Sequence, residues 1–96
     1  MSPKNKNKLA LIRVKLDKLD NQLLLLIKKR TILVNDVLKL KEFKNEIVDK
    51  KRINQILKKI RLKSKRIKID PKITNRIWKN MIWSYINYER KNFKKK

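Results

Sequence analysis

The segment from about Lys8 to Phe43 contains neither proline nor glycine, and this uninterrupted stretch constrains the fold more than any other feature of the chain. Within it, aliphatic side chains follow one another at steps of three or four residues, which is the spacing of one face of a helix. Such a helix would be about 50 Å long, whereas a compact monomer of this size is only about 30 Å across. The helix therefore has to project beyond its own fold, and a partner chain is expected to cover its apolar face.

Two shorter helices are predicted to follow. Residues 44–48 are expected to form a short connection, and Asp49 is predicted to be the N-cap of a second helix that ends in the basic stretch 63–68. Asp70 and Pro71 are typical of the N-cap and first residue of a third helix. The apolar faces of these two helices are formed by Ile53, Ile56, Leu57 and Ile60, and by Ile73, Ile77, Trp78, Met81, Ile82, Tyr85 and Ile86.

No strand pattern or internal repeat competes with this interpretation, so the sequence predicts an all-α fold. A length of 96 residues corresponds to one domain, 1–96. Its basic ends, residues 1–7 and 94–96, are expected to fray.

Arg30 and Lys41 occupy the apolar stripe of the long helix at positions where core side chains are expected. They are about three turns apart and so lie on nearly the same face. A buried cation is costly unless an anion meets it, and only 8 Asp and Glu face 30 Lys and Arg in this chain. A ligand anion is therefore favoured as the partner of these cations. The alternative is that both side chains lie at the flank of the stripe and extend into solvent. Glu89 is the converse case, an acid on the apolar face of the third helix, and its simplest structural role is to pair with one of the cations.

The composition excludes many kinds of active site. The chain has no Cys, His or Gly, so disulfides, thiolate nucleophiles, the usual zinc ligands, the commonest general base and Gly-rich phosphate loops are all missing. No metal or cofactor is expected. The longest purely aliphatic run, residues 23–27, is too short to span a bilayer, and the polar start does not resemble a signal peptide, so a cytoplasmic protein is predicted.

The formal net charge of +22 favours a different class of function, a basic helical protein that binds nucleic acid. Two observations weaken this alternative. Lys, Asn and Ile are enriched together and share A/T-rich codons, so compositional bias by itself accounts for a basic surface. A phosphate binder also needs its cations clustered outside, whereas Arg30 and Lys41 lie on the apolar stripe.

Several segments together carry a family resemblance. From Leu9 to Glu89, nearly the whole chain resembles the all-helical, bacterial-type chorismate mutases and the related isochorismate pyruvate lyases. The matching segments are Ile12–Asp20 with Arg13, the aliphatic run Leu23–Arg30, Lys41, Val48–Arg52, the pair Asp70–Pro71, and Glu89.

The resemblance implies an intertwined homodimer of three-helix subunits with two equivalent sites. It implies that Arg13 crosses into the site of the partner subunit, while Arg30 binds a carboxylate of the substrate. Arg52 would support the carboxylate-binding network, and Asp49 would contact the hydroxyl end of the ring through its backbone.

The same resemblance implies that Lys41 and Glu89 address the ether oxygen of chorismate. The implied reaction is the intramolecular Claisen rearrangement of chorismate to prephenate in the shikimate pathway of aromatic amino acid biosynthesis, which requires only a clamped conformer and positive charge or hydrogen bonds at that oxygen. Ile53 stands where such mutases commonly carry Glu, and Tyr85 replaces a smaller residue. Both changes are similar to the lyase branch, so isochorismate pyruvate lyase is the nearest alternative, and Glu89 has to be protonated in order to donate a hydrogen bond.

Overall fold

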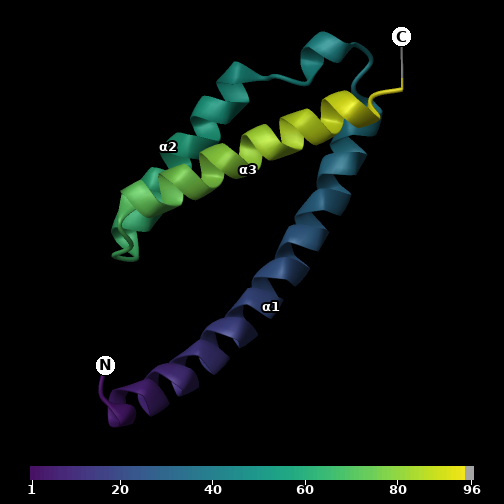
Figure 1. Ribbon diagram of the computed structural model, residues 1–96. Coiled ribbons are helices and arrows are strands. Elements are labelled where there is room, and N and C mark those ends of the chain that lie inside the picture. The colour runs from purple at the N-terminus through teal and green to yellow at the C-terminus, as the bar shows by residue number, and fades with distance from the viewer. Residues whose placement is uncertain (95–96) are drawn as a thin grey trace. The chain divides into compact units, whose positions relative to one another are not determined.

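The computed structural model describes residues 1–94 and consists of helices (Figure 1). They are α1 (Pro3–Leu40), a short 3₁₀ helix η1 (Lys44–Glu46), α2 (Lys50–Arg66) and α3 (Pro71–Asn92). No strand occurs among residues 1–94, and the predicted all-α fold with a very long first helix is confirmed. Among the residues described, none of the helices is both long enough and apolar enough to cross a membrane.

The first helix begins five residues before its predicted start, at Pro3 instead of Lys8. Ser2 caps this end, because its hydroxyl oxygen accepts a hydrogen bond from the backbone N–H of Asn5 at 3.2 Å and its carbonyl accepts one from Lys6 at 2.8 Å. Proline is well suited to the first turn, where its missing N–H is not needed. At the far end of the chain, Lys94 follows α3, while residues 95 and 96 of the predicted basic terminus lie outside the described part.

The helix also ends earlier than predicted, at Leu40 instead of Phe43. The carboxylate of Glu46 accepts hydrogen bonds from the backbone N–H groups of Glu42 and Phe43, at 2.7 and 2.8 Å. These two bonds hold the chain in a tight turn that leads into η1. The predicted connection is therefore built by a side chain three or four residues downstream, which helical periodicity does not reveal.

The predicted caps of the two shorter helices are confirmed. The side chain of Asp49 accepts from the backbone N–H of Arg52 at 3.0 Å, and that of Asp70 accepts from Lys72 at 2.9 Å. Between α2 and α3 the chain turns through Lys68, which has a positive φ of 61°. Such a residue commonly ends a helix, although the position usually belongs to Gly or Asn.

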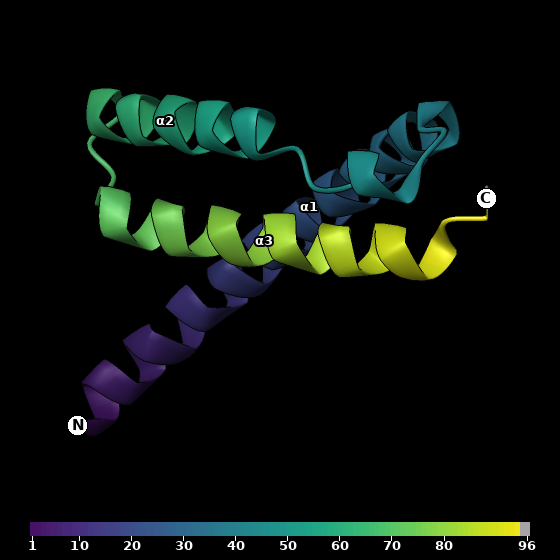
Figure 2. The ribbon, with the colours of Figure 1, turned by 90° about the horizontal axis from the view of Figure 1, so that it is seen from above.

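The two shorter helices lie antiparallel and side by side, as Figures 1 and 2 show. Ser64 and Thr74 join them through a hydroxyl pair at 2.7 Å, and Ser64 is buried. A small core lies at the other end of this helical pair, and Val48, Ile53, Ile56, Leu57 and Phe93 pack around it. Its buried members are Leu38, Ile47, Ile82 and Ile86.

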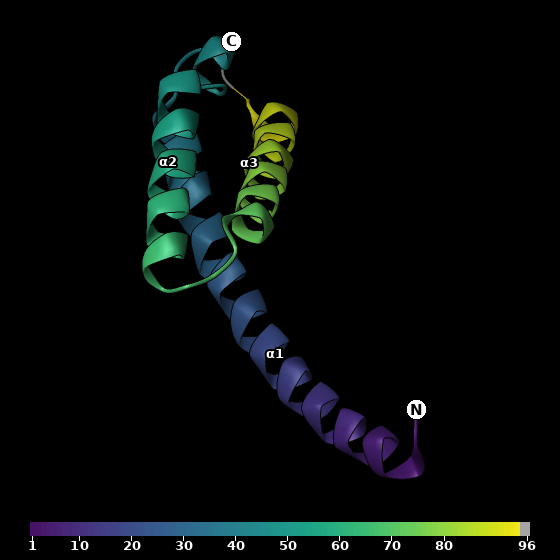
Figure 3. The same cartoon turned by 90° about the vertical axis from the view of Figure 1, so that its left-hand side faces the viewer.

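The chain divides into two compact units, Met1–Val34 and Asn35–Lys96, with the boundary inside α1. The first unit is a single helical segment, and its aliphatic stripe is exposed in the isolated chain. The second unit contains the last turns of α1 together with η1, α2 and α3 (Figure 3). Exposed members of the stripe in the first unit include Ile12, Leu16, Leu19, Leu23, Leu26 and Leu33.

Candidate functional site

The centre of the candidate site is an ion pair between Lys41 and Glu89 in the second unit. Lys41 directly follows the last residue of α1, and its amino group lies 3.3 Å from one carboxylate oxygen of Glu89 and 3.5 Å from the other. Glu89 belongs to α3 and is only 6% exposed. The structure therefore identifies Lys41 as a cation that meets the acid on the apolar face.

Glu89 is buried because it continues the core face of α3. Ile82 and Ile86 are the two core residues that precede it at helical steps, and all three are buried. A carboxylate at such a position is destabilising unless an opposite charge or hydrogen-bond donors compensate for its lost hydration. Lys41 supplies both, and its own side chain is largely shielded from solvent.

Lys41 also lines an open hollow of about 670 Å³ together with Asp49. The carboxylate of Asp49 is engaged in capping α2, where it accepts the N–H of Arg52. The remaining lining residues are Asn45, Glu46, Val48 and Lys50.

Three further predicted site residues lie on α2 and α3 in the same unit. Arg52 is exposed in the first turn of α2, and Ile53 beside it is half-buried and packs against the core. Tyr85 is half-buried on α3, one turn before Glu89. Of the predicted set, the structure brings Lys41 into contact with Glu89 and into the same hollow as Asp49.

Arg13 and Arg30 belong to the first unit. Arg13 is exposed and Arg30 is partly buried in the single chain. Their grouping with Lys41 and Glu89 stays a prediction, and for Arg13 that prediction involves a second subunit.

One contact near the site was not anticipated from the sequence. The hydroxyl of Tyr88 donates to the side-chain oxygen of Asn35 at 2.9 Å and ties the last turns of α1 to α3. Neither residue belongs to the apolar faces, so helical periodicity contains no signal for the pair. A tyrosine one position before Glu89 was the single available indication, because a half-buried Tyr usually finds a partner for its hydroxyl.

Chemically, the pair of Lys41 and Glu89 offers two kinds of hydrogen-bonding group at one place. The ammonium group donates to an oxygen that gains negative charge, and such stabilisation is strong where water is excluded. The carboxyl group accepts when ionised and donates when protonated. Such an arrangement suits a reaction in which charge develops on an ether or hydroxyl oxygen.

A comparison with known families gives an independent result. The model of the family described as chorismate mutase type II matches residues 12–90, which is most of the chain and includes every predicted site residue. No curated protein and no solved structure matches the chain.

Proposed function

Since the chain belongs to the chorismate mutase type II family, we propose that it converts chorismate to prephenate. In this rearrangement the ether C–O bond of chorismate breaks while a new C–C bond forms within the same molecule. No proton, electron or group is exchanged with the enzyme, so no nucleophile or cofactor is required. The protein has to hold a compact conformer and stabilise negative charge on the ether oxygen.

The observation that carries the proposal is the shielded pair of Lys41 and Glu89, at 3.3 Å. In the proposed complex the ammonium group of Lys41 turns toward the ether oxygen and neutralises the charge that develops there. Glu89 lies beside it and adds a second hydrogen bond when its carboxyl group is protonated. Removal of one such donor from an active site typically costs about 10²–10³-fold in rate.

The two carboxylates of chorismate need cations of their own. We assign them to Arg30 and to Arg13 of a second subunit, with Arg52 in support, because Arg binds carboxylates through two parallel hydrogen bonds. The backbone of Asp49 contacts the hydroxyl end of the ring, while Ile53 and Tyr85 form its apolar surroundings.

A second copy of the chain is part of this proposal. The stripe of the first unit exposes large aliphatic side chains, among them Leu19 at 55% and Leu26 at 58%. Complete burial of each such side chain contributes about 1.5–3 kcal/mol. An antiparallel or intertwined partner helix would cover these side chains and would bring Arg13 to the site of the other subunit.

Isochorismate pyruvate lyase is the second candidate, and Ile53 and Tyr85 favour it. A glutamate at position 53 would offer a carboxylate to the ring hydroxyl, and Ile53 has none. The two candidates share the fold, the anion-binding residues and the ether oxygen, and they differ in substrate and product.

The test is to incubate purified protein with chorismate and, in parallel, with isochorismate, and to identify the products by chromatography. Prephenate from chorismate supports the mutase, whereas pyruvate released from isochorismate without any prephenate supports the lyase. Lys41→Gln should abolish most of the activity. Lys91→Gln removes the same charge from an exposed position two residues beyond Glu89 and should leave the rate unchanged. Failure of the wild type to convert either substrate would refute both candidates.

A further inference from the structure

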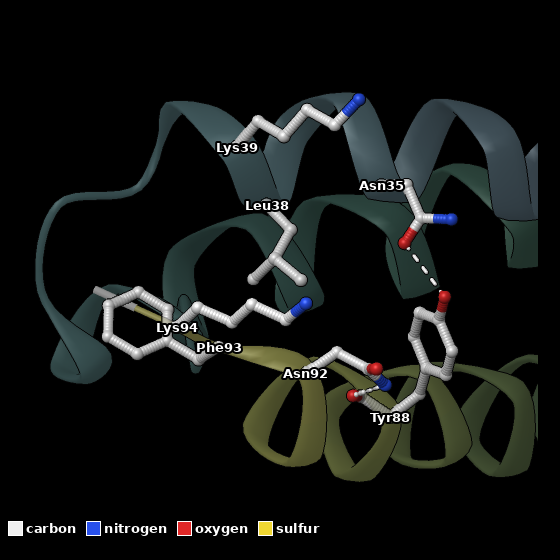
Figure 4. Close-up of a pocket in the computed structure, with 7 residues that line it drawn as sticks. All are labelled: Asn35, Leu38, Lys39, Tyr88, Asn92, Phe93 and Lys94. Atoms are coloured by element: carbon white, nitrogen blue, oxygen red, sulfur yellow. Dashed lines mark hydrogen bonds between the residues drawn. The ribbon is translucent and has the colours of Figure 1, made fainter.

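A cavity of about 350 Å³ lies between the last turns of α1 and the end of α3, within the second unit (Figure 4). None of the residues to which the proposed reaction assigns a role lines it. Its volume falls within the usual range of small-molecule pockets, about 300–1,000 Å³.

The floor of the cavity is apolar. Leu38 is almost fully buried and Phe93 is half-buried, and the ring of Tyr88 rises from α3 toward Asn35 (Figure 4). The hydrogen bond from Tyr88 to Asn35 fixes this ring in place. A flat hydrocarbon group between these side chains would remove their remaining apolar surface from water, which is favourable.

The charge of the cavity is positive. Lys94 extends its amino group toward the centre of the lining side chains (Figure 4), and Lys39 also lines the cavity. None of the described residues that line it is acidic. The side-chain amide of Asn92 donates a hydrogen bond to the backbone carbonyl of Tyr88 at 2.8 Å. The side-chain oxygen of Asn35 accepts the hydrogen bond from the hydroxyl of Tyr88, so the N–H donors of Asn35 are not used in that bond.

We propose that this cavity binds a small organic carboxylate with a flat apolar body. The apolar body lies against Leu38, Phe93 and Tyr88, and the carboxylate meets the ammonium group of Lys94. Binding requires both halves of the ligand. The apolar side chains cannot bind a charge, and an ion pair with the solvated ammonium group contributes little by itself.

Neither Lys41 nor Glu89 is among the residues that line the cavity. Both places nevertheless join the end of α1 to α3, through Asn35 and Tyr88 in one case and through Lys41 and Glu89 in the other. A ligand in the cavity therefore stabilises the packing of the helices that carry the ion pair.

The experiment uses the full-length protein with 3-phenylpropionate as the probe, followed by NMR of the aromatic rings. The chain has only two Tyr and two Phe, of which Tyr88 and Phe93 line the cavity while Tyr85 and Phe43 do not. Saturable shifts at Tyr88 and Phe93, with a dissociation constant on the order of 1 mM, are expected for a ligand of this size. Acetate and 3-phenylpropanol, which lack the ring or the charge, should bind at least about tenfold more weakly.

Two isosteric substitutions locate the site. Asn92→Asp places a carboxylate at the cavity wall and should weaken binding of the probe at least about fivefold through repulsion. Asn80→Asp makes the same change elsewhere on α3 and should have no effect. Circular dichroism shows whether both variants are folded.

The proposal is overturned if the probe leaves the Tyr88 and Phe93 signals unchanged, as it would if another subunit filled the cavity. It is also overturned if acetate or 3-phenylpropanol binds as tightly as the probe, or if Asn92→Asp and Asn80→Asp behave alike. Because binding is read from ring signals without turnover, these outcomes are independent of whether the chain acts on chorismate.

Discussion

The two units of this chain differ in how their apolar side chains are shielded from water. Asn35–Lys96 folds two helices and the end of a third around its own core, with the caps and hydroxyl pair described above. Met1–Val34 is one helical segment with a stripe of exposed aliphatic side chains. A helix that forms from local sequence signals is therefore not yet a packed element, because its apolar face gains stability only from a partner surface.

The largest expected effect comes from a substitution on the apolar stripe of the first unit, which the proposed dimer buries. Leu23→Glu places a charge on the stripe and should dissociate the proposed dimer, with loss of activity and a cost of about 3 kcal/mol or more per subunit. Leu25→Glu is the matched control, because Leu25 is similarly exposed but lies on the opposite side of the helix. Analytical ultracentrifugation measures the change, and equal behaviour of the two variants would show that the stripe is not an interface.

The next effect concerns function carried by the first unit. Arg30→Ala should lower kcat/KM for chorismate about 10²–10³-fold while the helix content stays the same. An Arg13→Ala variant should be similarly impaired.

Mixing the two arginine variants should recover roughly a quarter of the wild-type activity at random pairing, because a mixed dimer keeps one intact site. Rates after unfolding and refolding the variants together measure this recovery. If mixed dimers form and remain inactive, Arg13 does not serve the partner subunit.

A smaller effect concerns the ion pair of the second unit. A carboxylate at Glu89 repels negative charge on the ether oxygen, whereas the amide of Gln carries a permanent N–H donor that can bond to it. Glu89→Gln should therefore keep or raise kcat/KM for chorismate. A Glu89→Gln variant that is folded but inactive would leave Glu89 as a structural partner of Lys41.

Stability of the second unit should depend on the hydroxyl pair between α2 and α3. Ser64→Ala removes the hydroxyl that contacts Thr74 across the two helices, while Thr74 keeps the carbonyl of Pro71 as an acceptor, and the change should lower the free energy of unfolding by about 1 kcal/mol. Ser84→Ala is the matched control, since Ser84 is exposed and bonds only the carbonyl of Asn80 within its own helix. Urea denaturation distinguishes the variants, and equal midpoints would contradict a role of the pair in joining the helices.

The smallest effect is expected at the turn between the same helices. Lys68 has a φ of 61°, a conformation that costs a residue with a Cβ about 1–2 kcal/mol, so Lys68→Gly should stabilise the protein by up to about 1 kcal/mol. Lys65→Gly, three residues earlier inside α2, should destabilise it by about the same amount. Thermal melting of both variants checks the opposite signs.

Local signals in the sequence predicted the number and order of the three α-helices, whereas the 3₁₀ helix η1 lies in the segment expected to be a connection. Asp49, Asp70 and Pro71 marked the starts of α2 and α3 correctly because capping depends on residues within one turn. The end of α1 was predicted three residues late, because the Glu46 carboxylate competes with the helix for the N–H groups of Glu42 and Phe43. The helical periodicity of apolar residues does not reveal such a competition for backbone N–H groups.

For the candidate site, helical periodicity identifies the charged residues that interrupt apolar faces, whereas the packing of separate helices brings particular ones into contact. A charged residue at a helical step along an apolar face, such as Lys41 or Glu89, is visible without coordinates because hydrophobic burial has a fixed period. Which acid meets which cation depends on how separate helices pack, and 30 cations left many choices for Glu89. Packing of α3 against the end of α1 brings Lys41 to Glu89. The same packing forms the hydrogen bond from Tyr88 to Asn35 and the cavity beside it. Contacts between residues some 50 positions apart arise only from the three-dimensional fold, so local sequence signals do not predict them.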